Sequence, residues 1–101
     1  MKYERSNRAR NDYSRLSESN KKSFKEAVAL LNDAYERRGE QIIPAWPKQL
    51  RVKDVAGAKG VWEMTWEWPN GRATFEYLDL GDNQMGIRWR RIGSHEIFRD
   101  P

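Results

Sequence analysis

The chain has 101 residues, which is enough for one hydrophobic core and too few for two. It contains no cysteine, which excludes disulfide bonds and thiolate metal sites and makes a reducing cytoplasm the expected location. Nineteen lysines and arginines against fifteen acids give a net charge of +4, which favours an anionic partner such as nucleic acid. No apolar run is long enough to span a membrane, so we expect neither a signal peptide nor membrane contact.

Residues 1–15 are polar and rich in arginine, and Tyr3 and Tyr13 are their only aromatic side chains. This composition permits either a short strand followed by a helix or a loose basic arm. Ser17 is then a favourable helix N-cap. Apolar residues recur after it at spacings of three and four, which predicts the main helix over residues 17–38, with Gly39 ending it in a left-handed conformation.

Residues 50–98 show the short alternating pattern of an antiparallel sheet. Alternation from Val61 places four large apolar residues on one face of a strand: Trp62, Met64, Trp66 and Trp68. Asn70-Gly71 is a strong hairpin signal, and a two-residue turn there would set Met64 opposite Tyr77. A second turn is expected at Gly81-Asp82-Asn83, before a last strand over residues 86–92. A further strand is expected to begin at Leu50.

These elements predict an α+β fold, in which N-terminal helices pack on one face of a small antiparallel sheet. We expect a single domain over residues 1–101, with the main helix covering the tryptophan face. The opposite sheet face would then stay open and carry the ionisable side chains, which are Glu63, Glu67, Arg72, Glu76, Arg88 and Arg90, with His95 at the rim.

Trp46 lies between Pro44 and Pro47 in a connector that cannot be helical. We therefore expect Trp46 to be the tryptophan that is free to act as an exposed platform or partner contact. Trp62, Trp66 and Trp89 are assigned to the core, and Trp68, beside the hairpin turn, is not assigned to either class.

Four short motifs follow one another in the second half of the chain: Leu50 to Lys53, Gly60 to Met64, Gly71 to Tyr77, and Arg91 to His95. In this order and spacing they resemble the RelE/ParE superfamily of toxins from bacterial toxin–antitoxin pairs, nearest its RelE, YoeB and HigB members. The resemblance covers about Arg15 to Phe98. It implies a small ribonuclease fold whose open sheet face enters the ribosomal A site and cuts messenger RNA, with a cognate antitoxin as the inhibitor.

The resemblance also implies a reaction without metal or cofactor, in which the ribose 2′-hydroxyl attacks the adjacent phosphate. By position, Arg72 matches the family arginine that follows the hairpin turn, and Lys53 matches the lysine before the glycine loop. Arg90 or Arg91 matches the late arginine, and His95 matches the terminal histidine of YoeB-like members. The chain departs from the pattern in having Glu96 after this histidine and no terminal tyrosine, as well as an extended arginine-rich N-terminus.

Such a reaction needs a base, an acid and cations around the phosphorane. We predict His95, Arg72, Arg90 and Glu63 as catalytic residues. His95 is the only side chain that ordinarily titrates near neutral pH, and the arginines are suited to phosphate oxygens. The alternative for each is structural: a histidine bonded to backbone, a cross-strand ion pair, or a solvated charge. Contacts with the RNA backbone are predicted for Lys53, Lys59, Arg88 and Arg91.

Two other functions fit the sequence. One is a non-catalytic relative that acts on DNA gyrase as ParE does, or binds RNA without cutting it. The other is an interaction module that uses the basic surface and Trp46. A metal site is not expected, because a single histidine and no cysteine leave only carboxylates, without EF-hand spacing.

Overall fold

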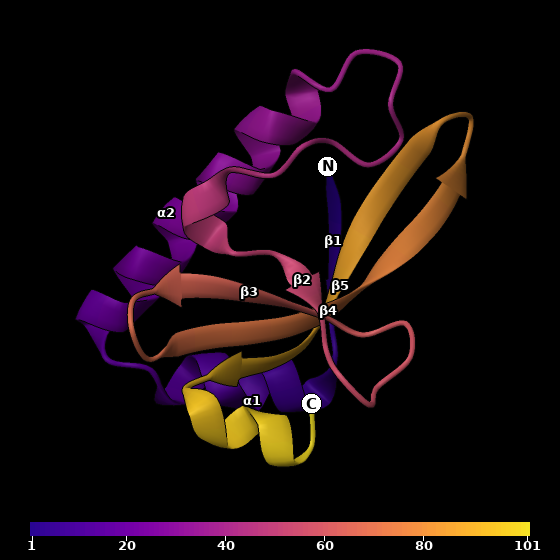
Figure 1. The fold of residues 1–101 in the computed structure, drawn as a ribbon. Coiled ribbons are helices and arrows are strands. Elements are labelled where there is room, and N and C mark those ends of the chain that lie inside the picture. The colour runs from indigo at the N-terminus through magenta and orange to yellow at the C-terminus, as the bar shows by residue number, and fades with distance from the viewer.

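The computed structural model describes all 101 residues and has a five-stranded sheet with two helices packed on one face (Figure 1). The strand order is β1-β5-β4-β3-β2; β1 is parallel to β5 and the other pairs are antiparallel. The elements in chain order are β1 (Lys2–Arg5), α1 (Asn7–Arg15), α2 (Glu18–Glu36), η1 (Lys48–Leu50, a 3₁₀ helix), β2 (Lys53–Asp54), β3 (Trp62–Glu67), β4 (Gly71–Gly81), β5 (Gln84–Gly93) and η2 (His95–Arg99, also 3₁₀). The predicted α+β class is confirmed.

The first fifteen residues form a strand and a helix rather than a loose arm. The Ser6 hydroxyl caps α1 by accepting from the Ala9 N–H at 3.0 Å, and it donates to the Arg90 carbonyl at 2.9 Å. β1 can lie close to β5 because Gly86 has no side chain, and a Cβ there would lie 2.7 Å from the Lys2 carbonyl oxygen. The sequence left this strand as one of two alternatives, and its pairing with β5 was not predicted, since its four residues show no alternation of their own.

The main helix α2 begins at the Ser17 cap, whose hydroxyl accepts from the Asn20 N–H at 3.0 Å. Its buried residues are Phe24, Ala27, Leu31 and Tyr35. Phe24 packs edge-on against Trp66 and Trp89, with ring centroids 6.2 and 5.2 Å apart. The apolar stripe of the helix thus covers the tryptophan face of the sheet. No helix of the structure combines the length and the apolar character needed to cross a bilayer.

The predicted register of the β3–β4 hairpin is wrong by four residues. The turn consists of Trp68, Pro69 and Asn70, and Met64 pairs with Ala73 rather than with Tyr77. Pro69 has no N–H to donate to a ladder, so Glu67 and Gly71 form the last pair of the two strands before the turn. An even shift leaves every side chain on its expected face. The tight turn with two left-handed residues occurs in the next hairpin, at Asp82 (φ 50°) and Asn83 (φ 60°).

The segment around residue 50 is also different from the prediction. Instead of a strand from Leu50, the chain forms η1 and then only the two-residue β2. Trp46 is partly buried against the core, and its indole N–H donates to the Tyr77 hydroxyl at 3.0 Å. Because its ring is held in this way, the expectation that Trp46 forms an exposed platform is wrong.

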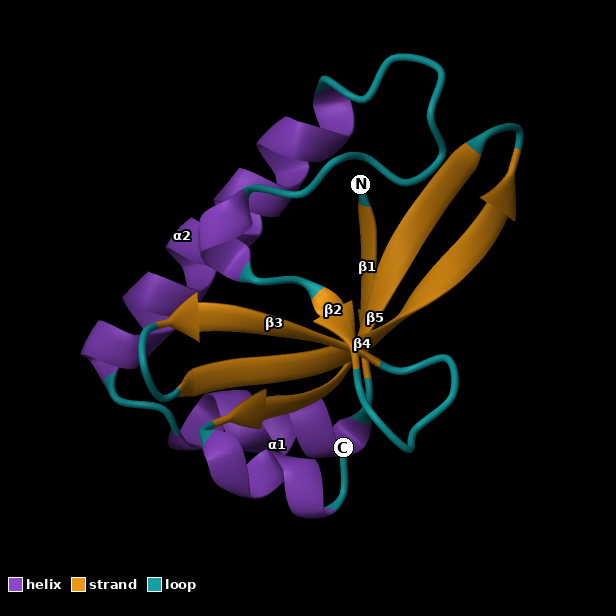
Figure 2. Ribbon diagram, in the orientation of Figure 1, coloured by secondary structure: helices purple, strands orange, loops and turns teal.

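The second face of the sheet is only partly open, because η2 packs on it. Ile97 of η2 is 1% exposed. A Cβ on Gly93 would lie 2.9 Å from Ile97 Cγ2, so the missing side chain of Gly93 makes room for η2. The C-terminal segment ends beside α1 (Figure 2). Arg8 Nη1 of this helix lies 2.8 Å from Asp100 Oδ2. The expectation of a fully open polar face is therefore corrected.

Candidate functional site

The polar face of the sheet is built from two neighbouring rows of residues that pair across the strands. In one row Lys53, Glu63, Thr74 and Arg91 are successive partners from β2 to β5. In the next row Thr65, Arg72 and Gly93 are partners. Glu63 and Arg72 therefore occupy diagonal positions on adjacent strands, which corresponds to about 7–8 Å between Cα atoms. The fold thus brings a predicted base and a predicted phosphate ligand into one neighbourhood.

Arg72 is a buried cation without a carboxylate partner. The residue is 6% exposed, and its hydrogen bond runs from Nη1 to the Gly71 carbonyl at 3.2 Å. Its guanidinium carbon lies 5.5 Å from the centroid of the Trp68 ring. A buried charge is costly unless it is paired. The surroundings of Arg72 therefore favour the binding of an anion.

Arg88 and Arg90 share one carboxylate on β4. Glu76 Oε1 lies 3.7 Å from Arg88 Nη1, and Glu76 Oε2 lies 3.2 Å from Arg90 Nη1. Arg90 Nε also donates to the Pro101 carbonyl at 3.1 Å. Two positive charges around one negative charge leave this part of the face with an excess of positive charge.

Glu63 is mostly buried, with a side chain 15% exposed, and its nearest cation is Lys53 at 4.0 Å. Its partner across the ladder, Thr74, is fully buried, and the Thr74 hydroxyl has no hydrogen-bond partner in the fold. Thr74, with its unpaired hydroxyl, and Glu63 are thus cross-strand neighbours at the centre of the polar face. Arg72 precedes Thr74 by two residues on the same strand and the same face.

His95 stands at the start of η2 and is exposed. Its ring packs edge-on against Phe98, with centroids 6.0 Å apart. No hydrogen bond or ion pair joins its imidazole to Glu63, Arg72 or Arg90 in this structure. The predicted alternative of a histidine bonded to backbone is likewise not what is found, since the imidazole makes no hydrogen bond.

The remaining predicted RNA contacts have different surroundings. Arg91 is held by Asp12, with Arg91 Nε donating to Asp12 Oδ2 at 2.7 Å, and this hydrogen bond raises the pKa of Arg91 above its ordinary value. Lys59 is exposed in the loop between β2 and β3, between two glycines with left-handed backbone. Arg91 is thus largely engaged within the fold, whereas Lys59 has no ionic partner.

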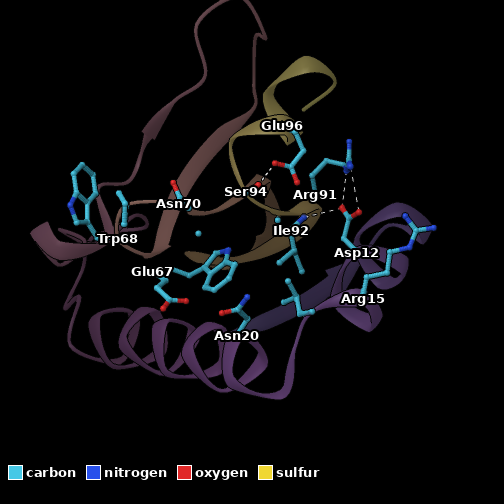
Figure 3. A pocket seen from close by; sticks show the side chains of 15 residues that line it. Asp12, Arg15, Asn20, Glu67, Trp68, Asn70, Arg91, Ile92, Ser94 and Glu96 are labelled. Carbon is cyan, nitrogen blue, oxygen red and sulfur yellow. Dashed lines mark hydrogen bonds and ion pairs between the residues drawn. The ribbon is translucent and has the colours of Figure 1, made fainter.

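A cleft of about 600 Å³ lies at the end of the sheet, next to the β3–β4 turn (Figure 3). The α1–α2 junction and the β5–η2 junction form its other walls. It carries acids and bases together, at Asp12, Arg15, Glu67, Arg91 and Glu96. In Figure 3 the Trp68 indole stands at the far end of the cleft from Arg15.

Several of these cleft residues were not singled out from the sequence. Asp12 and Arg15 belong to α1. The sequence did not decide whether residues 1–15 form a helix or a loose arm, so the positions of these two side chains could not be predicted. Trp68 carried a weak signal, because it precedes a proline at the hairpin turn. No group of three or more carboxylate or imidazole side chains lies close enough together to hold a metal ion.

No protein-family model matches the sequence, and no curated protein matches it either. Two solved structures from E. coli have the same fold. The DinJ–YafQ complex contains a chain that is 19% identical, aligned over 95% of this chain and 94% of that one with a TM-score of 0.60. The toxin RelE, a mutant in complex with a peptide of the antitoxin RelBc, is 12% identical, aligned over 97% and 90% with a TM-score of 0.55. The chain therefore has the RelE-like fold over almost its full length.

Proposed function

We propose that this chain, which has the RelE-like fold, is the toxin of a toxin–antitoxin pair and cleaves messenger RNA on the ribosome. Ribosome-bound messenger RNA would place its action in the cytoplasm. The likeness to the two E. coli structures supports the toxin role, because RelE is a toxin that was solved with a peptide of the antitoxin RelBc, and the other chain also comes from a two-protein complex. One observation carries the nuclease proposal: Arg72 is a buried cation that has no ion-pair partner. It occupies the position diagonal to Glu63 on the adjacent strand of the polar face.

The proposed reaction is an internal transesterification of the RNA backbone. The ribose 2′-oxygen forms a bond to the adjacent phosphorus, and the bond from phosphorus to the 5′-oxygen breaks. A base removes the proton of the 2′-hydroxyl, and an acid gives a proton to the departing 5′-oxygen. The products are a cyclic phosphate and a free 5′-hydroxyl, so the step needs no oxidant and no water.

Glu63 is proposed as the base, and its carboxylate lies 4.0 Å from the Lys53 ammonium group. Arg72 would hold the non-bridging phosphate oxygens, where the negative charge of the phosphorane develops. Arg90 would add positive charge, because Glu76, its carboxylate partner, is shared with Arg88 and neutralises only one of the two arginines. His95 is proposed as the acid, which requires the RNA to reach the start of η2, where this side chain is exposed.

The other cations are proposed to position the RNA backbone. Lys59 and Arg88 are exposed, and Lys53 is 69% exposed despite its contact with Glu63. Arg91 would contribute less, since Asp12 already engages its guanidinium. Contacts of this type fix the position of the strand without reading its sequence.

The test is induced expression in a bacterial host, with wild type compared with Arg72→Ala and His95→Ala and with 5′-end mapping of cellular messenger RNA. Growth arrest with cuts that disappear in both variants is the expected result. Arg37→Ala is the matched control, because Arg37 caps the C-terminal end of α2, is exposed, and forms its ion pair with Asp33 of that helix rather than with a residue of the polar face. Circular dichroism and thermal unfolding of each variant would separate a lost function from a lost fold.

Two results would contradict the proposal. Arrest with intact messenger RNA would move the function towards an inhibitor such as a gyrase poison. No arrest, with a folded protein, would leave a binding module and remove the catalytic roles assigned to Arg72 and His95.

A further inference from the structure

Trp68 is the one strongly exposed tryptophan of the five in this chain. It is 62% exposed, at the β3–β4 turn and on the wall of the cleft (Figure 3). The other four are buried or packed against the core. A large ring that is left in water at a turn contributes little to folding, so its exposure points to a ligand.

Two arginines lie against this ring. The guanidinium carbon of Arg51 lies 4.1 Å from the Trp68 ring centroid, and that of Arg72 lies 5.5 Å from it. Neither guanidinium forms an ion pair with a carboxylate in this structure: Glu63, on the strand next to Arg72, is paired with Lys53. The three side chains thus combine an aromatic surface with two unneutralised positive charges.

The backbone of Arg51 is held in an unusual conformation next to this cluster. Its φ is 46°, in the left-handed region that glycine normally occupies, and its N–H donates to the Lys48 carbonyl at 3.1 Å. Non-glycine residues that remain in this region are found preferentially at functional sites. At this position the conformation ends η1 and leaves the Arg51 side chain over the Trp68 ring.

We propose that Trp68, Arg51 and Arg72 form a binding site for one nucleotide of single-stranded RNA. The base would stack on the indole, and the phosphate would lie within reach of the two guanidinium groups. This inference rests on the proposed function, and it adds Trp68 and Arg51 as positioning residues to the sheet-face site. A nucleotide fits better than an apolar helix, because the neighbours Glu67 and Asn70 are polar and make the apolar surface small.

The experiment measures binding of the purified protein to a 2′-O-methyl RNA octamer, in which the attacking hydroxyl is blocked. A second octamer has the same backbone with abasic positions. Trp68→Ala is expected to weaken binding of the first octamer about tenfold, while Trp68→Phe retains most of the affinity. Arg51→Gln is expected to reduce the slope of log affinity against log salt by about 0.7, the value for one phosphate contact on a single strand.

Arg37→Gln is the control, since it removes one exposed positive charge from the C-terminal end of α2. Iodide quenching gives a second readout, because Trp68 is the tryptophan that iodide can reach, and bound RNA should protect it. Unchanged affinity in Trp68→Ala overturns the inference, as does equal affinity of the wild type for the abasic octamer. Normal RNA binding by Trp68→Ala, combined with loss of inhibition by the cognate antitoxin, overturns it in favour of a protein-docking surface.

The two proposals can fail separately. If the wild type cuts messenger RNA and Trp68→Ala binds RNA as tightly as the wild type, the nuclease stands and the nucleotide site does not. If the wild type binds RNA through Trp68 and cuts no messenger RNA, the nucleotide site stands and the nuclease does not.

Discussion

Asp12 on α1 holds Arg91 on β5 through a charge-assisted hydrogen bond, with Arg91 Nε donating to Asp12 Oδ2 at 2.7 Å. The same carboxylate oxygen accepts from the backbone N–H of Ile92 at 3.0 Å. Both side chains are well shielded, at 13% exposed for Asp12 and 18% for Arg91. One carboxylate thus fastens the first helix to the last strand, at the edge of the cleft.

Asp12→Ala is expected to lower the free energy of unfolding by about 1–3 kcal/mol, because it leaves a shielded guanidinium and a backbone N–H without their acceptor. Urea unfolding of the purified variant measures this change. Asp33→Ala is the control: its pair with Arg37 is exposed on α2, and the expected loss is below about 1 kcal/mol. Equal losses in the two variants would show that Asp12 is an ordinary surface acid.

Gly93→Ala tests how η2 is seated on the sheet. The added methyl group would lie 2.9 Å from Ile97 Cγ2, so η2 has to shift, and we expect a loss of about 1–3 kcal/mol in unfolding free energy. In an Ile97→Ala background the same change should cost much less, since the clashing carbon is gone. An additive double mutant would contradict this contact. If the nuclease proposal holds, Gly93→Ala also reduces cleavage, because His95 is carried by η2.

Glu76→Gln is expected to strengthen binding of the 2′-O-methyl octamer. The substitution removes the negative charge shared by Arg88 and Arg90 and leaves both cations free for phosphate. The slope of log affinity against log salt should become steeper by about 0.7–1.4, corresponding to one or two added contacts on a single strand. Glu18→Gln, which frees Lys21 on α2 instead, is the control and should leave the slope unchanged. Unaltered binding by Glu76→Gln would place the RNA elsewhere.

Tyr3 gives the protein an alkaline dependence of stability. Burial raises the pKa of Tyr3 to about 12, and its hydroxyl donates to Asn32 Oδ1 at 2.7 Å. The pKa is raised in the folded state, so the stabilisation is complete below the ordinary tyrosine pKa near 10 and is lost as the pH rises towards about 12. The free energy of unfolding should therefore fall with rising pH over this window.

In Tyr3→Phe this fall should be shallower, and the variant should already be less stable at neutral pH by about 1 kcal/mol, the worth of one hydrogen bond. Guanidinium unfolding at several pH values between 8 and about 12 checks both effects. Part of the slope should persist in the variant, because burial also raises the pKa of Tyr77. Identical pH profiles for the two proteins would contradict the role of Tyr3.

Part of the candidate site could be read from the sequence. Alternation along β3 and β4 placed Glu63 and Arg72 on the face opposite the tryptophans, and the four-residue error in register did not change this. Whether these residues would be paired, buried or free could not be read in the same way. Arg72 was expected among open charges and is 6% exposed, whereas Arg91 is held by an acid 79 positions away in the chain.

By itself the sequence determined the α+β class, the main helix and the two faces of the hairpin, because periodicity and capping depend on neighbours within a few residues. The tertiary structure decided that β1 joins the sheet beside β5, that η2 covers part of the polar face, and that Trp68 rather than Trp46 stands in solvent. Each of these outcomes depends on contacts between segments far apart in the chain. Such contacts form only where shapes and polar groups match after folding, and no local pattern encodes that match.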